Sequence, residues 1–337
     1  MKNVLIIGPD FFGYNQSIER AFKNLGFETR TMAYTPGQVR TLKEKFEFHL
    51  SGGNKEAFFK KIKKAFNKQL SDTYNKFKPD LIFIIQGNYI FKETIEMMRC
   101  KKVLWMMDSI YRAEEAYQIR NAIDFIFVFE RTDIDKLWQS DNIKAKFLPL
   151  ALDETIYFPI YPKEKRVIDI LFVGFLYENR IKLLKKIIGR FDHLTIKIYG
   201  RYYSPIRRPY YHFFRNDKKI FLNKNITPRK VNELYNISSI CLNIHHNQSQ
   251  YGVNQRFFEI SGSRTFQLVD SNPYIEDNFS ADEIVTYKSE DDLFEKIEQF
   301  LKDKATTDSK AEQAYHRVLN NHTFTHRIKE VLEIVGG

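Results

Sequence analysis

The sequence predicts an α/β protein built from two doubly wound parallel sheets, one in each half of the chain, which face a central cleft. Three observations predict this fold class. A length of 337 residues suits two domains of about 150 residues each. Short, continuously apolar runs alternate with helix-length segments, as is typical of parallel strands that are covered on both faces. The alternation stops at a stretch with two prolines near the middle of the chain and then restarts.

The first half, residues 1–150, opens with a strand over Val4–Gly8, followed by a helix over about Asn15–Leu25 and a strand near Phe27–Ala33. A long helix is expected over Asn54–Phe77. The remaining strands of this half are Leu81–Gln86, Val103–Met107, Phe125–Phe129 and Ala145–Leu148. Because parallel strands need crossover connections, the segments between them are expected to form helices on the faces of one Rossmann-like sheet.

Residues 151–166, with Pro159 and Pro162, are interpreted as an interdomain linker. A second Rossmann-like domain is assigned to residues 167–320, and residues 321–337 to a helix that packs back on the first domain. The expected elements of the second domain are strands Asp169–Gly174, Leu194–Gly200, Ile240–Ile244 and Thr265–Val269, helices Arg180–Arg190 and Asn254–Ser261, a helix from Pro228 capped by Thr227, and amphipathic helices from Ser289 onward.

Composition restricts the class of protein. With 43% hydrophobic residues the chain has ample material for two cores, which excludes disorder. Cys100 and Cys241 form neither a disulfide framework nor a zinc site, as expected in a reducing compartment. No apolar run reaches the roughly 18–20 residues of a membrane span, and the start resembles a strand rather than a signal peptide. A cytoplasmic location is expected, with peripheral attachment to the inner face of the membrane as an option.

The net charge of +11 favours an anionic partner: nucleic acid, an anionic membrane surface or phosphorylated small substrates. The helix over Asn54–Phe77 combines an aromatic stripe with many lysines and could dock on anionic lipid, although packing of the stripe on the sheet is the favoured interpretation. The insertion Tyr202–Leu222, with Arg207, Arg208, Tyr210, Tyr211 and Arg215, could clamp phosphates or an acceptor, or stack single-stranded nucleic acid. No recognised nucleic-acid motif supports the last option.

Glycine turns follow the first strand of each half. Gly8 and Gly13 bracket a turn that leads into a helix and could bring backbone N–H groups to a phosphate or sugar oxygen, although a plain tight turn explains them equally well. The turn is not a dinucleotide fingerprint and has no Walker A lysine. In the second half, Gly174 allows close backbone approach, and Arg180 at a helix start could pair with a diphosphate; the alternative is a solvated arginine.

The richest segment runs from His245 and His246 through Asn254 to Arg256 and Glu259. Arg256 lies in the first turn of the expected helix, where the helix dipole disfavours a cation unless an anion lies nearby. Glu259 follows three residues later, on the same face of the helix. Arg256 could meet a diphosphate and Glu259 the two hydroxyls of a ribose, or the two could form a local ion pair. One histidine is expected to face the cleft as a hydrogen-bond donor, and His245 is the candidate, with a catalytic role. No ligand set completes a metal site around the histidines.

Asp108 ends the strand Val103–Met107 and is expected to face the cleft. It could act as general base on an acceptor hydroxyl, or cap the helix that follows. Asp133 and Asp135 have the spacing of a metal-binding D-x-D motif, but they lie in an apparent helix rather than at a strand end. No metal site is therefore assigned.

The ordered set Asp169–Arg180, Asn254–Glu259, Tyr287-Lys288-Ser289 and His322–Arg327 resembles the glycosyltransferases grouped with the spore-maturation protein CgeB, within the retaining glycosyltransferase superfamily of GT-B fold. The likeness covers about the last 170 residues. It implies a GT-B fold, a nucleotide-sugar donor held mainly by the second domain, and no essential metal. By this resemblance Glu259 binds the ribose, Asn254 belongs to the donor site, Gly174, Arg180 and Arg256 surround the diphosphate, and Ile226 meets the base.

One departure from that family concerns the sugar. Related glycosyltransferases often carry a second glutamate, eight positions before the ribose-binding one, and this chain has Tyr251 there. We therefore expect metal-independent, cofactor-free transfer of a sugar from a nucleotide diphosphate, with UDP as the expected nucleotide, to a hydroxyl of a glycan or lipid-linked precursor. The alternatives are an epimerase or hydrolase of the same fold, a noncatalytic sugar-nucleotide sensor and a nucleic-acid-binding protein.

Overall fold

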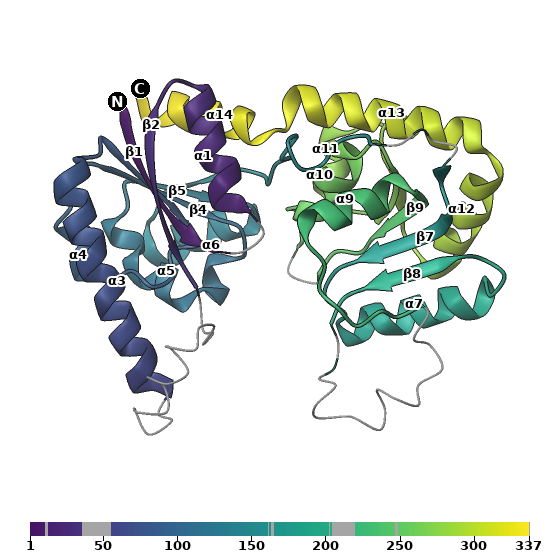
Figure 1. Cartoon of the computed structure of the whole chain (residues 1–337), viewed down its shortest axis with the longest axis horizontal. Coiled ribbons are helices and arrows are strands. Elements are labelled where there is room, and N and C mark those ends of the chain that lie inside the picture. Colours follow the sequence, from purple (N-terminus) through teal and green to yellow (C-terminus); the bar gives the residue numbers. More distant parts are fainter. Residues whose placement is uncertain are drawn as a thin grey trace. The chain divides into compact units, whose positions relative to one another are not determined.

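The computed structural model describes residues 1–10, 13–35, 55–160, 162, 165–201, 203, 220–246 and 249–336 (Figure 1). The chain divides into two compact units. Unit 1 comprises Met1–Pro149 with Phe324–Gly337, and unit 2 comprises Leu150–Thr323. Each unit is a parallel sheet covered by helices, as the sequence predicts.

The strands of unit 1 are β1 (Asn3–Pro9), β2 (Glu28–Tyr34), β3 (Leu81–Ile85), β4 (Lys101–Met106), β5 (Phe125–Val128) and β6 (Ala145–Phe147). They are parallel and lie in the order β2-β1-β3-β4-β5-β6. The helices of unit 1 are α1 (Tyr14–Asn24), α3 (Lys55–Phe77), α4 (Lys92–Glu96), α5 (Glu114–Ile119), α6 (Thr132–Asp141) and α14 (Phe324–Gly336). The direction of strand addition reverses between β1 and β3, so the carboxyl ends of these two strands form a switch point of the kind where α/β sheets bind ligands.

The aromatic stripe of α3 belongs to the core of unit 1. Phe58, Phe66 and Leu70 are buried, and Phe59 and Ile62 pack against the same cluster. The lysines on the outer face of the helix, which include Lys60, Lys61, Lys64 and Lys68, are exposed. Packing of the stripe on the sheet is thus confirmed, and these rings are not available to insert into lipid.

Helix α14 returns the end of the chain to unit 1. The ring of Phe324 lies 5.9 Å from Trp105 of β4 and 6.4 Å from Tyr14 of α1, centroid to centroid. Nε of Arg327 donates to the carbonyl oxygen of Pro149 at 3.0 Å. The expectation that the last helix packs on the first domain agrees with these contacts.

The strands of unit 2 are β7 (Ile168–Val173), β8 (Ile196–Tyr199), β9 (Ser238–Asn243), β10 (Phe266–Asp270) and β11 (Val285–Tyr287), all parallel, in the order β11-β10-β9-β7-β8. The helices are α7 (Glu178–Arg190), α9 (Pro228–Asn236), α10 (Gln255–Gly262), α11 (Pro273–Asn278), α12 (Glu290–Lys302) and α13 (Lys304–Asn321). Thr227 caps α9 as predicted, whereas α11 and β11 were not predicted. The residues of the insertion singled out above, Arg207, Arg208, Tyr210, Tyr211 and Arg215, lie outside the described residues.

The segment expected to be a linker belongs to unit 2. The backbone N–H of Leu152 donates to the carbonyl oxygen of His322 at 2.7 Å, and Nε2 of Gln255 donates to the carbonyl oxygen of Ala151 at 2.6 Å. A Cβ on Gly262 of α10 would lie 2.2 Å from Cδ1 of Leu152, so only glycine admits this close packing. Among the described helices of both units, none is both long and apolar enough to cross a membrane.

Candidate functional site

The carboxyl edge of the unit 2 sheet carries most of the predicted site residues. Strand β7 lies between β8 and β9 in the sheet, so the direction of strand addition reverses between β7 and β9. Open α/β sheets bind ligands at such a switch point, outside the carboxyl ends of the strands. Gly174 follows β7 directly and His245 lies two residues beyond β9, which places both at this edge.

Two glycines let the chain cross closely beside β7 and β8. The N–H of Gly174 donates to the carbonyl oxygen of Tyr199 at 3.0 Å, which extends the strand pairing to the sheet edge. A Cβ on Gly200 would lie 2.0 Å from the carbonyl oxygen of Gly174, which no side chain tolerates. The glycine that permits this close approach between neighbouring segments is Gly200, and the approach of a ligand to the backbone at Gly174 stays a prediction.

Arg180, in the first turn of α7, lies at this switch point and is only 8% exposed. Its Nη1 donates to the carbonyl oxygen of Phe175 at 2.9 Å, and its Nη2 donates to the carbonyl oxygen of Ile244. Its Nε has no hydrogen-bond partner among the described residues, and no ion pair is formed there by Arg180. Burial lowers the pKa of the guanidinium, and the nearby Tyr177, Asp270 and Tyr287 offset this effect only in part. The solvated-arginine alternative does not describe this side chain.

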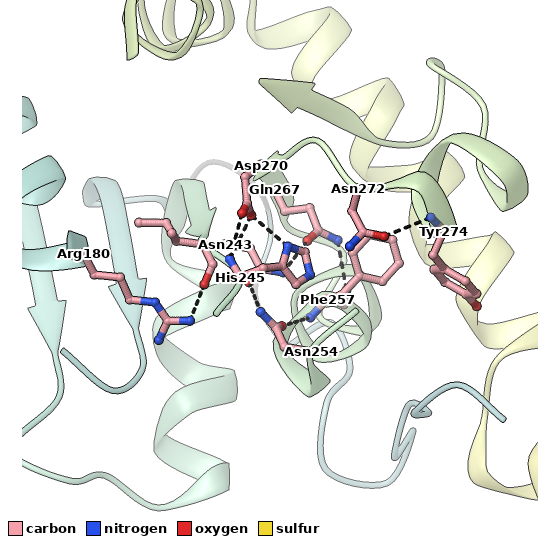
Figure 2. Close-up of polar contacts among 10 residues, drawn as sticks. Arg180, Asn243, His245, Asn254, Phe257, Gln267, Asp270, Asn272 and Tyr274 are labelled. Carbon is pink, nitrogen blue, oxygen red and sulfur yellow. Dashed lines mark hydrogen bonds and ion pairs between the residues drawn. The ribbon is translucent and has the colours of Figure 1, made fainter. Parts of the chain in front are cut away.

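His245 is paired with Asp270, the last residue of the neighbouring strand β10. Its backbone N–H donates to both carboxylate oxygens, at 2.9 and 3.1 Å, and its Nδ1 lies 2.8 Å from Oδ1 (Figure 2). Since a carboxylate only accepts, Nδ1 carries the proton. The opposite nitrogen, Nε2, is buried and has no partner among the described residues, and the whole residue is 5% exposed.

Tyr287, the last residue of β11, adds a third buried polar atom beside Asp270. Its hydroxyl has no partner within the described parts of the chain. Burial raises the pKa of Tyr287, and the carboxylate of Asp270 raises it further. Four strands that are adjacent in the sheet therefore each contribute one polar side chain near the carboxyl edge: Arg180 after β7, His245 after β9, Asp270 of β10 and Tyr287 of β11.

The N-terminus of α10 is tied to the sheet by amide side chains. Oδ1 of Asn254 accepts from the N–H of Phe257 and caps the helix, and its Nδ2 donates to Oδ1 of Asn243 at 2.7 Å (Figure 2). Asn243 in turn donates to Gln267, which donates to the carbonyl oxygen of Phe257 at 2.9 Å. Asn254 thus fixes where α10 begins, and both ends of its amide are already engaged.

Arg256 and Glu259 form an ion pair on one face of α10, with Nη1 and Oε2 2.6 Å apart. The Glu259 side chain is 7% exposed and that of Arg256 27%. Burial alone would lower the pKa of Arg256, but the carboxylate outweighs burial and holds the pKa well above its ordinary value. Burial and the same carboxylate raise the pKa of Tyr157, which places its phenol beside the pair. The local ion pair foreseen as one alternative is therefore present.

Ile226 lies half-buried in the loop directly before Thr227, the cap residue of α9. The ring of His246, the second histidine, meets that of Tyr177 at 4.6 Å, edge to face. Among the described residues no group of three acidic, histidine or cysteine side chains is placed to hold a metal ion. Asp133 accepts hydrogen bonds from Oγ of Ser109 and the N–H of Ile110, as a structural residue of unit 1.

Asp108 lies at the carboxyl edge of the unit 1 sheet. It is exposed, and Oδ2 accepts from Nε2 of Gln86 at 3.0 Å. The 3-10 turn Ile110–Arg112 and helix α5 have Ser109 and Ala113 as N-cap residues, so the capping alternative for Asp108 is not borne out. Gln86, which follows β3, has a positive φ of 65° and leaves Oε1 buried with no partner in the described chain.

Gly8 and Gly13 also lie at this edge. The carbonyl oxygens of Gly8 and Pro9 accept from Nδ2 of Asn15 at 3.2 Å each, and a Cβ on Gly8 would lie 2.1 Å from Oδ1 of Asn15. Gly13 is the N-cap of α1, with a φ of 79° that favours glycine. Both glycines therefore have a structural reason that is independent of any ligand.

Sequence reasoning missed Asp270, Tyr287 and Gln86. Asp270 and Tyr287 each end a strand, and Gln86 follows one, a position that marks a ligand edge in parallel sheets. That signal was available for Asp270 in the predicted strand Thr265–Val269, but its pairing with His245, 25 residues earlier, appears only in the folded chain.

Comparison with known proteins places this geometry in context. Residues 180–333 match a family model described as glycosyl transferase-like. The comparison with curated proteins found no significant match. Sucrose-phosphate synthase from Thermosynechococcus elongatus has a similar structure, with a TM-score of 0.67 at 11% identity over 99% of each chain.

Two further structures bear on the ligand. The Anabaena protein HepE, solved in complex with UDP, matches with a TM-score of 0.63 at 8% identity over 100% of both chains. A UDP-N-acetylglucosamine 2-epimerase matches with a TM-score of 0.52 at 13% identity over 93% of this chain and 90% of the epimerase. At such identities the likeness concerns the fold. The chain has the GT-B fold of two parallel-sheet α/β units, and its second half is similar to glycosyl transferases.

Proposed function

We propose that this protein is a glycosyltransferase that moves a sugar from a nucleotide diphosphate, UDP, to a hydroxyl of a glycan or lipid-linked glycan precursor, without a metal. The observation that carries the proposal is Arg180. A guanidinium that is 8% exposed, lies at the switch point of a parallel sheet and has carbonyl oxygens as its hydrogen-bond acceptors is suited to receive an anion.

The donor is assigned to the carboxyl edge of unit 2. Arg180 and the backbone at Gly174 receive the diphosphate, and Ile226 before α9 lies against the base. Glu259 accepts hydrogen bonds from the ribose hydroxyls, which requires the carboxylate to share or give up Arg256. Released from Glu259, Arg256 adds a second cation for the leaving diphosphate. The presence of UDP in a structure of the same fold supports UDP as the nucleotide.

The acceptor is assigned to the carboxyl edge of unit 1. Asp108 is exposed there and held by Gln86, as suits a carboxylate that takes a proton from an acceptor hydroxyl. The exposed lysines of α3 suit peripheral attachment to an anionic membrane surface, since each lysine near such a surface contributes about 1 kcal/mol. A lipid-linked acceptor would be presented at that surface.

Thermal unfolding in the presence of UDP-, GDP-, dTDP- and CMP-sugars tests the donor. A ligand at about 100 times its Kd adds roughly 2.7 kcal/mol to the free energy of unfolding, which is readily measured as a rise in Tm. We expect UDP-sugars to raise the Tm most. Failure of every nucleotide sugar to raise it would contradict the proposal.

An epimerase or hydrolase is the second candidate, because a UDP-N-acetylglucosamine 2-epimerase shares the fold. Analysis of the sugar product with and without an acceptor separates the two activities. A transferase releases UDP at a rate that rises with acceptor and attaches the sugar to it. An altered or freed sugar formed at the same rate without acceptor would favour the second candidate.

A further inference from the structure

The imidazole of His245 offers a buried hydrogen-bonding atom that the described chain leaves unused. Nε2 has no partner there, although the residue is 5% exposed. A buried polar atom without a partner costs about 1–3 kcal/mol, so such an atom in a native protein calls for a ligand or an ordered water. His245 lies at the carboxyl edge of the sheet and directly follows Ile244, whose carbonyl oxygen accepts from Arg180.

Asp270 determines which kind of ligand atom Nε2 can meet. The carboxylate holds His245 by three contacts, two from the backbone N–H and one from Nδ1. The ring orientation and its tautomer are therefore fixed together, with the proton on Nδ1. In the neutral imidazole Nε2 is then an acceptor, not the donor expected from the sequence, and it needs an O–H or N–H donor.

Because Nε2 needs a hydrogen-bond donor, it can bind a sugar hydroxyl but not an ionised phosphate oxygen. The oxygens of an ionised diphosphate only accept hydrogen bonds, so they suit Arg180 rather than Nε2 of neutral His245. A sugar hydroxyl donates and suits it well. The residue that would be expected to read the sugar, eight positions before Glu259, is Tyr251, and its hydroxyl donates to Asp277 at 2.8 Å while its ring packs edge to face on Tyr274.

We propose that Nε2 of His245 accepts a hydrogen bond from a hydroxyl of the transferred sugar. Asp270 is the positioning residue that fixes the tautomer and the orientation of the His245 ring. The inference rests on the proposed function, because it assumes a nucleotide sugar bound at the carboxyl edge of unit 2. It assigns the sugar contact to a residue pair on β9 and β10 in place of the missing glutamate.

Calorimetric titration with UDP and with UDP-glucose, UDP-galactose and UDP-N-acetylglucosamine tests the inference. The measured quantity is the ratio of the Kd for UDP to the Kd for the UDP-sugar that binds the wild type best. In His245→Ala we expect this ratio to fall about tenfold, while the Kd for UDP itself changes less than about threefold. His246→Ala, which alters the neighbouring ring packed on Tyr177, should leave the ratio unchanged.

The positioning role of Asp270 has a spectroscopic signature. Nitrogen-15 NMR of the histidine ring should show Nδ1 protonated and Nε2 unprotonated in the wild type at neutral pH. Asp270→Asn should shift this tautomer population and lower the same Kd ratio, with the fold checked by circular dichroism. Should Asp270→Asn fail to fold, the wild-type NMR signature and His245→Ala still decide the matter.

Three results would overturn the inference: a proton on Nε2 in the wild type, an equal loss of UDP and UDP-sugar affinity in His245→Ala, or an equal fall of the ratio in His246→Ala. In each of these results the wild type still binds the nucleotide, so the proposed function is not touched. Absence of any nucleotide binding to the wild type would instead contradict the proposed function, and this inference with it.

Discussion

The carbonyl oxygen of Gly174 lies where a Cβ on Gly200 would stand, 2.0 Å from that position, so the carboxyl ends of β7 and β8 meet through backbone alone. A side chain at Gly200 would push this oxygen away and displace the turn that leads to Arg180. The close approach therefore links a feature of the backbone to the position of the proposed diphosphate-binding cation.

Gly200→Ala should destabilise unit 2 by about 1–3 kcal/mol, the usual cost of overpacking a well-packed site. Gly189→Ala is the matched control, since Gly189 lies in α7 with nothing within 4 Å of its would-be Cβ. That change should stabilise by about 0.5–1 kcal/mol, because alanine favours the helix. Urea denaturation measures both, and equal effects of the two substitutions would contradict the close-packing argument.

Glu259→Gln should weaken UDP binding at least about tenfold and lower the free energy of unfolding by about 2 kcal/mol. The first effect follows from the proposed ribose contact. The second follows from the loss of the charge that compensates the partly buried Arg256. Calorimetry and urea denaturation measure the two effects.

Glu312→Gln serves as the control for that experiment. Its carboxylate pairs with Arg264 at 3.6 Å, with both side chains about one-third exposed, so its removal should cost less than about 1 kcal/mol. It should not change UDP affinity. If Glu259→Gln changed stability but left UDP affinity at the wild-type value, Glu259 would not bind the ribose. Its ion pair with Arg256 would then have a structural role alone.

Asp108→Asn should lower kcat by roughly 10²-fold or more while the Kd for UDP stays unchanged, because a general base acts on the acceptor and not on the donor. The comparison variant is Asp135→Asn, an exposed aspartate of α6 in the same unit, for which kcat should not change. Steady-state kinetics with a UDP-sugar and a turnover-competent acceptor provides the measurement. A kcat for Asp108→Asn within threefold of the wild type would remove Asp108 from the chemistry.

The ion pair between Arg120 and Asp141 should make the free energy of unfolding of unit 1 depend on pH. Hydrogen bonds from the Arg120 guanidinium and the Ser140 hydroxyl hold the pKa of Asp141 at about 2. In the unfolded chain an aspartate titrates near 3.9, approximately. Because the folded-state pKa is depressed, the stabilisation is fully present above about pH 4 and is lost as the pH falls toward 2.

Urea denaturation of the wild type and Asp141→Asn at several pH values between 6 and 2.5, approximately the range of that titration, checks this dependence. The difference in unfolding free energy should be largest at the neutral end and should shrink as the pH falls. A difference that is independent of pH would show that the pair does not stabilise through the charge of Asp141.

Most of the fold could be predicted because continuous apolar runs alternate regularly with helix-length segments. The strand before Gly174 and the helix that opens at Asn254 are marked by continuous burial and by an N-cap residue. Helix α11, with 6 residues, and strand β11, with 3, are shorter than any window in which periodicity can be read. Their absence from the sequence prediction has this cause.

Less of the candidate site could be predicted, because residue type does not reveal which partner a side chain meets. Asn254 was assigned to the donor site, yet the cap of α10 and the bond to Asn243 engage both ends of its amide. Arg180 and His245 were singled out correctly as residues at the carboxyl edge. The contact between Asp270 and His245 depends on strand pairing between β9 and β10, so the sequence does not reveal it.

The central claim is that a nucleotide diphosphate binds at the carboxyl edge of unit 2 against Arg180. Calorimetric titration of the wild type, Arg180→Ala and Arg180→Lys with UDP tests it most directly. We predict one UDP per chain, a loss of affinity of at least about tenfold in Arg180→Ala, and incomplete recovery in Arg180→Lys, because lysine lacks the planar fork of donors. UDP affinity that is absent in the wild type, or equal in all three proteins, would contradict the claim.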